Sequence, residues 1–166
     1  MTIFDIDIPN DYLLRIGRIT VAWGILESTV DLALARLGGF RHTDHRSAII
    51  TAHMSWPLKM DIMESLVNAL IPDHPQLARF PLAKPMLAEA QKARNQIDHG
   101  HGVYRDGQVY ALRTTARGKL RPSVTPLTLG ALDQALNDIA RAGRAVLDVV
   151  FDASGEPGAV IPDKAP

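Results

Sequence analysis

Apolar residues recur every three or four positions along residues 10–37, the spacing that places them on one face of an α-helix. Asn10 or Asp11 is expected to cap this helix, and Gly38-Gly39 to end it. A second face is also apolar, so the helix either lies at the centre of a bundle or packs against another subunit. The first stripe contains Leu13, Ile16, Ile19, Trp23, Leu26, Val30, Leu34 and Leu37, and the second contains Leu14, Val21, Ile25 and Leu32.

The same periodicity predicts three helices in the middle of the chain. One covers about residues 44–54, and the next begins at Ser55 and ends at Pro72. The prolines between residues 72 and 85 predict a broken connector, after which a helix resumes at about Pro85. Gly100 is placed to end that third helix.

After residue 100 the apolar spacing changes to two, which indicates strands. Asp106-Gly107 is a tight-turn signal, and strands are expected over 108–114 and 119–124, the second at a sheet edge because it contains Pro122. Thr128 is then expected to cap a last helix with an apolar stripe from 129 to 150.

The pattern as a whole predicts a mainly α fold. We expect an antiparallel bundle of about four to five helices, with a small β-hairpin at about residues 103–125 inserted before the last helix. A chain of 166 residues is long enough for one domain and short for two, so residues 1–151 are expected to form a single domain. Residues 152–166 are rich in glycine, proline, alanine and aspartate and predict a flexible tail.

Composition narrows the cellular setting. The absence of cysteine excludes disulfides and thiolate chemistry and fits a reducing cytosol. No segment approaches the roughly 20 uninterrupted apolar residues of a membrane span, and the start of the chain does not resemble a signal peptide. We therefore expect a cytoplasmic protein with no membrane partner.

Basic residues are concentrated in one region although the formal net charge of the chain is +0. A neutral chain exerts no general attraction on nucleic acid, but the predicted hairpin holds five basic residues against one acid, Asp106. Such residues either contact RNA or keep an exposed strand edge from pairing with other chains. They are Arg105, Arg113, Arg117, Lys119 and Arg121.

Candidate chemistry is concentrated at residues 94–101, the expected end of the third middle helix. Asn95 and His99 are four apart and share a helix face, and Arg94 and Asp98 form another such pair. Arg94 and His99 lie roughly 140° apart on an ideal helix, yet the long arginine side chain allows both to reach one ligand. His101 follows in the exit from the helix.

Three interpretations of this cluster are open from the residues alone. In the first, Arg94–Asp98 is a surface ion pair and His99 stabilises the negative end of the helix dipole. In the second, histidine moves protons, arginine stabilises charge on a phosphate and asparagine orients them, which suits attack of a ribose 2′-hydroxyl on the adjacent phosphate without a metal. A third interpretation, metal binding by Asp98, His99 and His101, with or without His53, lacks the usual helical ligand spacing.

Glu27 lies on the first apolar stripe, where an unpaired carboxylate is costly. Its expected role is a structural ion pair with a basic residue from another helix. Arg94 and Lys59 are the candidate partners, and pairing with Arg94 would orient the arginine.

The segment Arg94-Asn95-Gln96-Ile97-Asp98-His99 resembles the Arg-polar-x-x-x-His motif of HEPN domains, the all-helical "higher eukaryotes and prokaryotes nucleotide-binding" superfamily. Its Asn95, with Gly100 following, is similar to a common bacterial form of the motif. The order of elements over about residues 10–150 also resembles the HEPN four-helix bundle. The hairpin between the motif and the last helix resembles an insertion found in some bacterial members.

The resemblance implies a metal-independent endoribonuclease without a cofactor, often a toxin in toxin–antitoxin or phage-defence systems. It implies a homodimer whose two motifs line one cleft and act on RNA. Arg94 would then hold the scissile phosphate, His99 would be the general acid and base, and Asn95 would orient them. Glu27, Asp98 and His101 are supporting candidates.

HEPN proteins without demonstrated nuclease activity give the alternative. They are helical modules that bind a nucleotide or a partner protein, such as an antitoxin. The neutral net charge of the chain keeps this alternative open.

Overall fold

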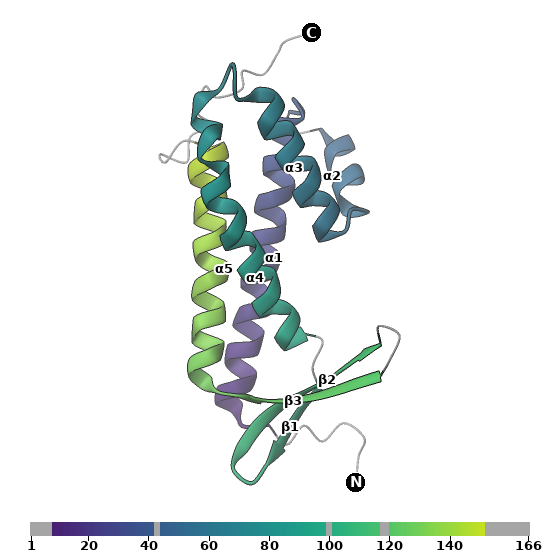
Figure 1. Cartoon of the computed structure of the whole chain (residues 1–166), viewed down its shortest axis with the longest axis vertical. Coiled ribbons are helices and arrows are strands. Elements are labelled where there is room, and N and C mark those ends of the chain that lie inside the picture. The colour runs from purple at the N-terminus through teal and green to yellow at the C-terminus, as the bar shows by residue number, and fades with distance from the viewer. Residues whose placement is uncertain (1–7, 42–43, 99–100, 117–119, 152–166) are drawn as a thin grey trace. The chain divides into compact units, whose positions relative to one another are not determined.

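The computed structural model describes residues 8–41, 44–98, 101–116 and 120–151 (Figure 1). It is mainly α, with a small antiparallel sheet before the last helix, which confirms the predicted fold class. In chain order the elements are α1 (Asn10–Leu37), α2 (His45–Ala52), α3 (Trp56–Leu70), the 3₁₀ helix η1 (Pro75–Arg79), α4 (Phe80–Asp98), β1 (His101–Arg105), β2 (Gln108–Ala116), β3 (Leu120–Leu127) and α5 (Leu129–Val150).

The chain divides into two compact units, neither of which is continuous in sequence. Unit 1 comprises Met1–Trp23 and Ala88–Ile139, and unit 2 comprises Gly24–Leu87 and Ala140–Pro166. Unit 1 therefore contains the first half of α1, the last turns of α4, the sheet and the first half of α5. The single domain expected over residues 1–151 stays a prediction, and the expected tail lies outside the described residues.

Unit 1 has a small apolar core between its helices and its sheet. Each fully buried aliphatic side chain contributes about 1.5–3 kcal/mol relative to an exposed one. At the edge of this core Arg15 Nε donates to Asp133 Oδ1 at 2.9 Å and joins α1 to α5. The buried residues are Ile19, Trp23, Ala90, Val109, Leu132, Ala135 and Ile139.

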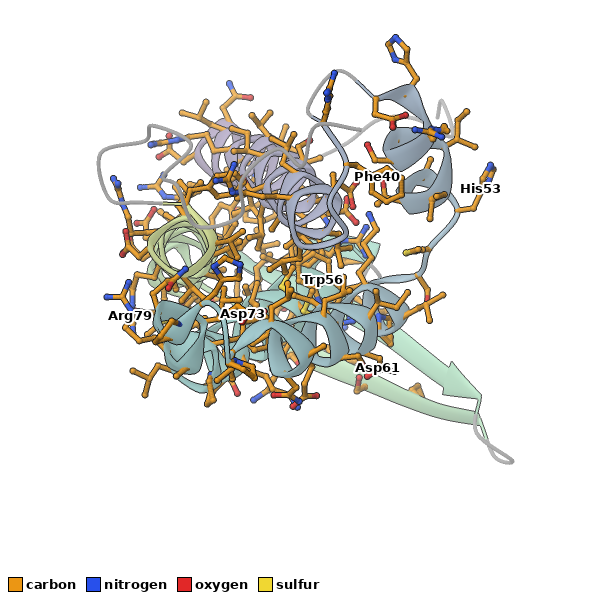
Figure 2. All side chains as sticks on the ribbon, turned by 90° about the horizontal axis from the view of Figure 1, so that it is seen from above. Phe40, His53, Trp56, Asp61, Asp73 and Arg79 are labelled. Atoms are coloured by element: carbon orange, nitrogen blue, oxygen red, sulfur yellow. The ribbon has the colours of Figure 1, made fainter. Side chains whose placement is uncertain are left out.

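Unit 2 is built from the helices α2, α3 and η1 and the adjoining parts of α1, α4 and α5. Figure 2 shows Trp56 pointing inward among these helices, whereas His53 and Asp61 point outward. Lys59 is buried near the start of α3 and pairs with Asp31 of α1. The buried apolar residues include Leu26, Val30, Leu34, Met63, Val67, Leu77, Phe80, Leu87 and Val146.

The ends of α1 follow from local backbone chemistry. Gly39 has a φ of +73°, and the amide of Phe40 donates to the carbonyl of Ala35 at 2.9 Å, so the predicted glycine stop is confirmed. At the other end the Pro9 carbonyl accepts from the amides of Tyr12 and Leu13. The first turn therefore begins one residue earlier than a cap at Asn10 would place it, and two earlier than a cap at Asp11.

The predicted start of α4 at about Pro85 is wrong, because the helix already begins at Phe80. Pro81 lies in the first turn, where amides have no partner within the helix, and Pro85 removes only one hydrogen bond from the interior. Phe80, Ala83 and Leu87 are all nearly fully buried in unit 2. Burial of this face offsets the bond that Pro85 cannot make.

The sheet has one strand more than the predicted hairpin. Its order is β1-β2-β3, with both neighbouring pairs antiparallel, so β3 is the edge strand that Pro122 predicted. Asp106 and Gly107 both have positive φ, 50° and 78°, as a two-residue type I′ turn requires. This turn joins β1 to β2 and fixes the register in which Arg105 lies opposite Gln108.

Candidate functional site

Arg94 and Asn95 lie in the last turns of α4, within unit 1. Arg94 comes one turn after the fully buried Ala90, so Ala90 and Arg94 lie on the side of the helix that faces the core. The long arginine side chain extends to the border of that core, and both Arg94 and Asn95 are half-buried. The amphipathic pattern of α4 thus places a guanidinium where it is partly removed from water.

Two of the contacts that the Arg94 side chain makes are with neutral groups. Its Nη1 donates to Asn95 Oδ1 at 3.2 Å. Its guanidinium carbon lies 5.5 Å from the centroid of the Trp23 ring, within cation–π range. Trp23 is only 5% exposed, so the ring is fixed by the core of unit 1.

Trp23 is the site residue that the sequence interpretation missed. It appears in the sequence as one member of the first apolar stripe, with no mark that separates it from its neighbours there. The useful signal is its residue type, because tryptophan is the best aromatic partner for a cation. That signal becomes informative only when the fold brings α1 beside the end of α4.

The remaining residues of the motif lie at the edge of the described chain. Asp98 is the last residue of α4 and His101 the first of β1, so only two residues separate helix from strand. His99, and the side chains of Asp98 and His101, lie outside the described residues. The expected convergence of Arg94 and His99 on one ligand stays a prediction.

Lys59, one of the two candidate partners of Glu27, pairs with another carboxylate. Its Nζ lies 2.6 Å from Asp31 Oδ1, and its side chain is only 7% exposed. Glu27 is half-buried in unit 2, whereas Arg94 belongs to unit 1. A pairing of Glu27 with Arg94 stays a prediction.

The basic residues of the sheet are only partly described. Arg105 ends β1, is 79% exposed, and its Nε lies 3.3 Å from Asp106 Oδ2. Arg113 lies in β2 opposite Ser123, and Arg121 lies in β3 opposite Thr115. The side chains of Arg113 and Arg121, together with Arg117 and Lys119, lie outside the described residues.

Two further features of the described chain concern metal binding and membrane spans. In residues 8–41, 44–98, 101–116 and 120–151 there is no group of three or more histidine, cysteine, aspartate or glutamate side chains placed to hold a metal ion. Over the same residues, no helix has both the length and the apolar character needed to cross a membrane.

Comparison with known proteins leaves the family open. No protein-family model matches the chain, and neither a curated protein nor a solved structure matches it. The motif and the surroundings of Arg94 are therefore the features that bear on function.

Proposed function

We propose that this protein is a HEPN-like, metal-independent endoribonuclease, a toxin or phage-defence component, that acts as a homodimer. The observation that supports the proposal most directly is the placement of Arg94. Its guanidinium is half-buried, and its direction is fixed by Asn95 Oδ1 and the Trp23 ring. A preorganised cation of this kind stabilises charge that develops on a phosphate during reaction.

In the proposed reaction a ribose 2′-hydroxyl attacks the adjacent phosphorus, and the bond to the 5′-oxygen of the next nucleotide breaks. His99 accepts the proton of the attacking hydroxyl, and a second imidazole donates a proton to the leaving oxygen. That second imidazole is the partner subunit's copy of the motif histidine, or His101. Arg94 stabilises the negative charge on the non-bridging oxygens. The products are a 2′,3′-cyclic phosphate and a free 5′-hydroxyl.

The exposed face of α1 supports the dimer in this proposal. On α1, two large apolar side chains of unit 1 and two of unit 2 are each more than half exposed, and such surfaces mark contacts with other molecules. A second copy of the chain is the proposed occupant, since a symmetric dimer buries the same patch from each subunit. The residues are Leu14 (62%), Val21 (65%), Ile25 (64%) and Leu32 (54%).

The decisive experiment incubates the purified protein with single-stranded RNA in the presence of EDTA. Cleavage with cyclic phosphate ends is expected from the wild type. Arg94→Ala and His99→Ala are each expected to reduce the rate at least 100-fold while the helical circular dichroism stays unchanged. Arg144→Ala and His53→Ala are matched controls, since both positions are exposed and lie outside the motif. RNA that stays intact with wild-type protein across varied sequences would contradict the proposal.

The same exposed α1 face gives the alternative its specific support, because a partner protein would also cover it. In that case the protein is a non-catalytic helical module. Sedimentation of the purified chain separates the two: a dimer that becomes a monomer on Val21→Glu supports the homodimer. A wild-type monomer that cleaves nothing supports the binding module.

A further inference from the structure

The two faces of the β1-β2-β3 sheet in unit 1 differ in their surroundings. On one face Val109 is fully buried, and the Cβ position of Gly102 lies 2.6 Å from Ile8 Cδ1, so this face packs against other parts of unit 1. The register places Val103 opposite Tyr110, and Tyr110 opposite Pro126, on the other side of the sheet. We call this second side the outer face.

The outer face is apolar where an antiparallel sheet usually presents polar side chains to water. Leu112 and Val124 are register partners on it, and they are 36% and 61% exposed. Val103 is 41% exposed, and Tyr110 lies between these residues in the central strand, half-buried. An exposed apolar surface that surrounds one aromatic ring indicates a binding site.

A positive charge on the outer face comes from Arg105. Residues 101–127 contain five arginines and lysines, but Arg113 and Arg121 occupy register positions that alternate with those of the outer face. Arg105 shares the outer face, since it lies two residues from Val103 along β1, and it is 79% exposed. A ligand that complements this face carries both negative charge and flat apolar surface. Unpaired nucleotides carry both.

We infer that the outer face binds single-stranded RNA, with a base stacked on Tyr110 and a phosphate contacted by Arg105. β1 begins at His101, immediately after the motif segment. An RNA strand bound to the outer face is therefore held near the proposed catalytic residues. Duplex RNA is excluded from stacking because its bases already stack on each other. The inference rests on the proposed function for its choice of ligand, but binding is measurable in protein that does not cleave.

The experiment uses the full-length chain carrying Arg94→Ala, which removes cleavage, and a fluorescein-labelled oligouridine of twelve nucleotides in EDTA. Fluorescence anisotropy gives the dissociation constant. Tyr110→Leu keeps an apolar side chain but loses the ring, so binding is expected to weaken about tenfold, whereas Tyr110→Phe keeps the ring and stays within about twofold. Arg105→Gln is expected to reduce the slope of log affinity against log salt by about 0.7.

Tyr104 provides a matched control within the same sheet. It is 39% exposed and lies opposite Val109, on the side away from Tyr110. Tyr104→Leu is therefore expected to leave the affinity within about twofold of the parent. Equal weakening by Tyr104→Leu and Tyr110→Leu would overturn the inference, as would a duplex that binds as tightly as the single strand.

Two further measurements keep the inference testable if Tyr110→Leu does not fold. Photocrosslinking of 4-thiouridine RNA to the Arg94→Ala protein is expected to label the segment 103–126, and labels found only elsewhere would contradict the inference. If Tyr110→Phe changes the subunit number in sedimentation, the outer face is a contact between copies and the inference fails.

The two proposals fail separately. RNA binding that depends on Tyr110, with no cleavage by the wild type, retains the inference and rejects the ribonuclease. Cleavage that depends on Arg94, with no effect of Tyr110→Leu on binding, supports the ribonuclease and rejects the inference about the outer face.

Discussion

Each unit contains a cationic side chain that is partly or almost fully removed from water, and the two cations contact different kinds of groups. In unit 2 the Lys59 side chain is 7% exposed, and a carboxylate, Asp31, lies 2.6 Å from its ammonium group. In unit 1 the half-buried Arg94 contacts the amide oxygen of Asn95 and the ring of Trp23. The Lys59 ammonium thus lies against a carboxylate, whereas these two contacts of Arg94 are with an amide oxygen and an aromatic ring. An amide and a ring orient a cation without adding an opposite charge.

The largest expected effect comes from removing the carboxylate from the first pair. Asp31→Ala leaves the buried Lys59 ammonium without its counter-charge and is expected to lower the free energy of unfolding by about 2–4 kcal/mol. Asp31 is 30% exposed, which favours the lower half of that range. Urea unfolding followed by circular dichroism measures the change.

The controls for this prediction separate loss of charge balance from loss of a side chain. Asp61→Ala removes an exposed carboxylate from the same unit and is expected to cost under about 0.5 kcal/mol. Adding Lys59→Met to Asp31→Ala removes the uncompensated ammonium and is expected to recover part of the lost stability. A double variant less stable than Asp31→Ala alone would show that Lys59 contributes mainly by packing.

The next effect concerns the ring beneath Arg94. Trp23→Leu removes the cation–π contact, and the rate of RNA cleavage per folded molecule is expected to fall about tenfold. Trp23→Phe retains an aromatic ring and is expected to retain most of the cleavage rate. Trp56→Leu is the matched control, because Trp56 is also a buried tryptophan, in unit 2. Both leucine variants are expected to lose stability, but only Trp23→Leu to lose activity.

A spectroscopic measurement tests the same contact without any assay of cleavage. In a Trp56→Phe background Trp23 is the single tryptophan, and Arg94→Ala is expected to change its fluorescence because the guanidinium no longer lies near the ring. An unchanged spectrum would argue against the contact in solution.

The smallest effect is expected for the pair of Arg46 and Asp44. Arg46 lowers the pKa of Asp44 from 3.8 to about 2, first through the hydrogen bond from its side chain and then through that from its backbone amide. Because the folded pKa is depressed, this contribution to stability is present above pH 3.8 and is lost as the pH falls through about 2. Both side chains lie at the start of α2, so the loss is confined to that helix end.

The pKa of Asp44 is measured by following the chemical shift of the backbone amide of residue 46 in an NMR titration. A midpoint near 2 is expected for the wild type, and Arg46→Ala is expected to move the midpoint of Asp44 towards 3.8. The same midpoint in both proteins would mean that Arg46 does not stabilise the carboxylate.

The elements predicted correctly from sequence are those in which periodicity and end signals agree. α1 combines a long stripe with Gly38-Gly39, and α5 begins where Thr128 Oγ1 accepts from the Ala131 amide at 3.1 Å. The start of α4 was missed because Pro81 and Pro85 are read locally as breaks, while the burial of Phe80 that offsets them is a tertiary effect. The sequence does not predict β1, because its residues directly follow the motif, where the pattern indicates the exit from the helix.

The candidate site was predictable only in part, for a physical reason. Arg94 and Asn95 are neighbours in sequence, so their contact is a property of one helix turn. The contact with Trp23 depends on how α1 packs in unit 1, and no spacing along the chain encodes it. The outer face of the sheet likewise becomes visible only once the register pairs Tyr110 with Val103 and Pro126.

The division of the chain into two discontinuous units has a consequence for its synthesis. Unit 1 requires residues from 1–23 and from 88–139, and its contact between Arg15 and Asp133 spans 118 positions. Unit 2 requires residues beyond 140. At roughly 5–20 residues per second, a ribosome needs on the order of ten seconds after α1 emerges before either unit has all its parts. The packing of Trp23 and the surroundings of Arg94 are therefore completed only after the residues of unit 1 up to Ile139 have been made.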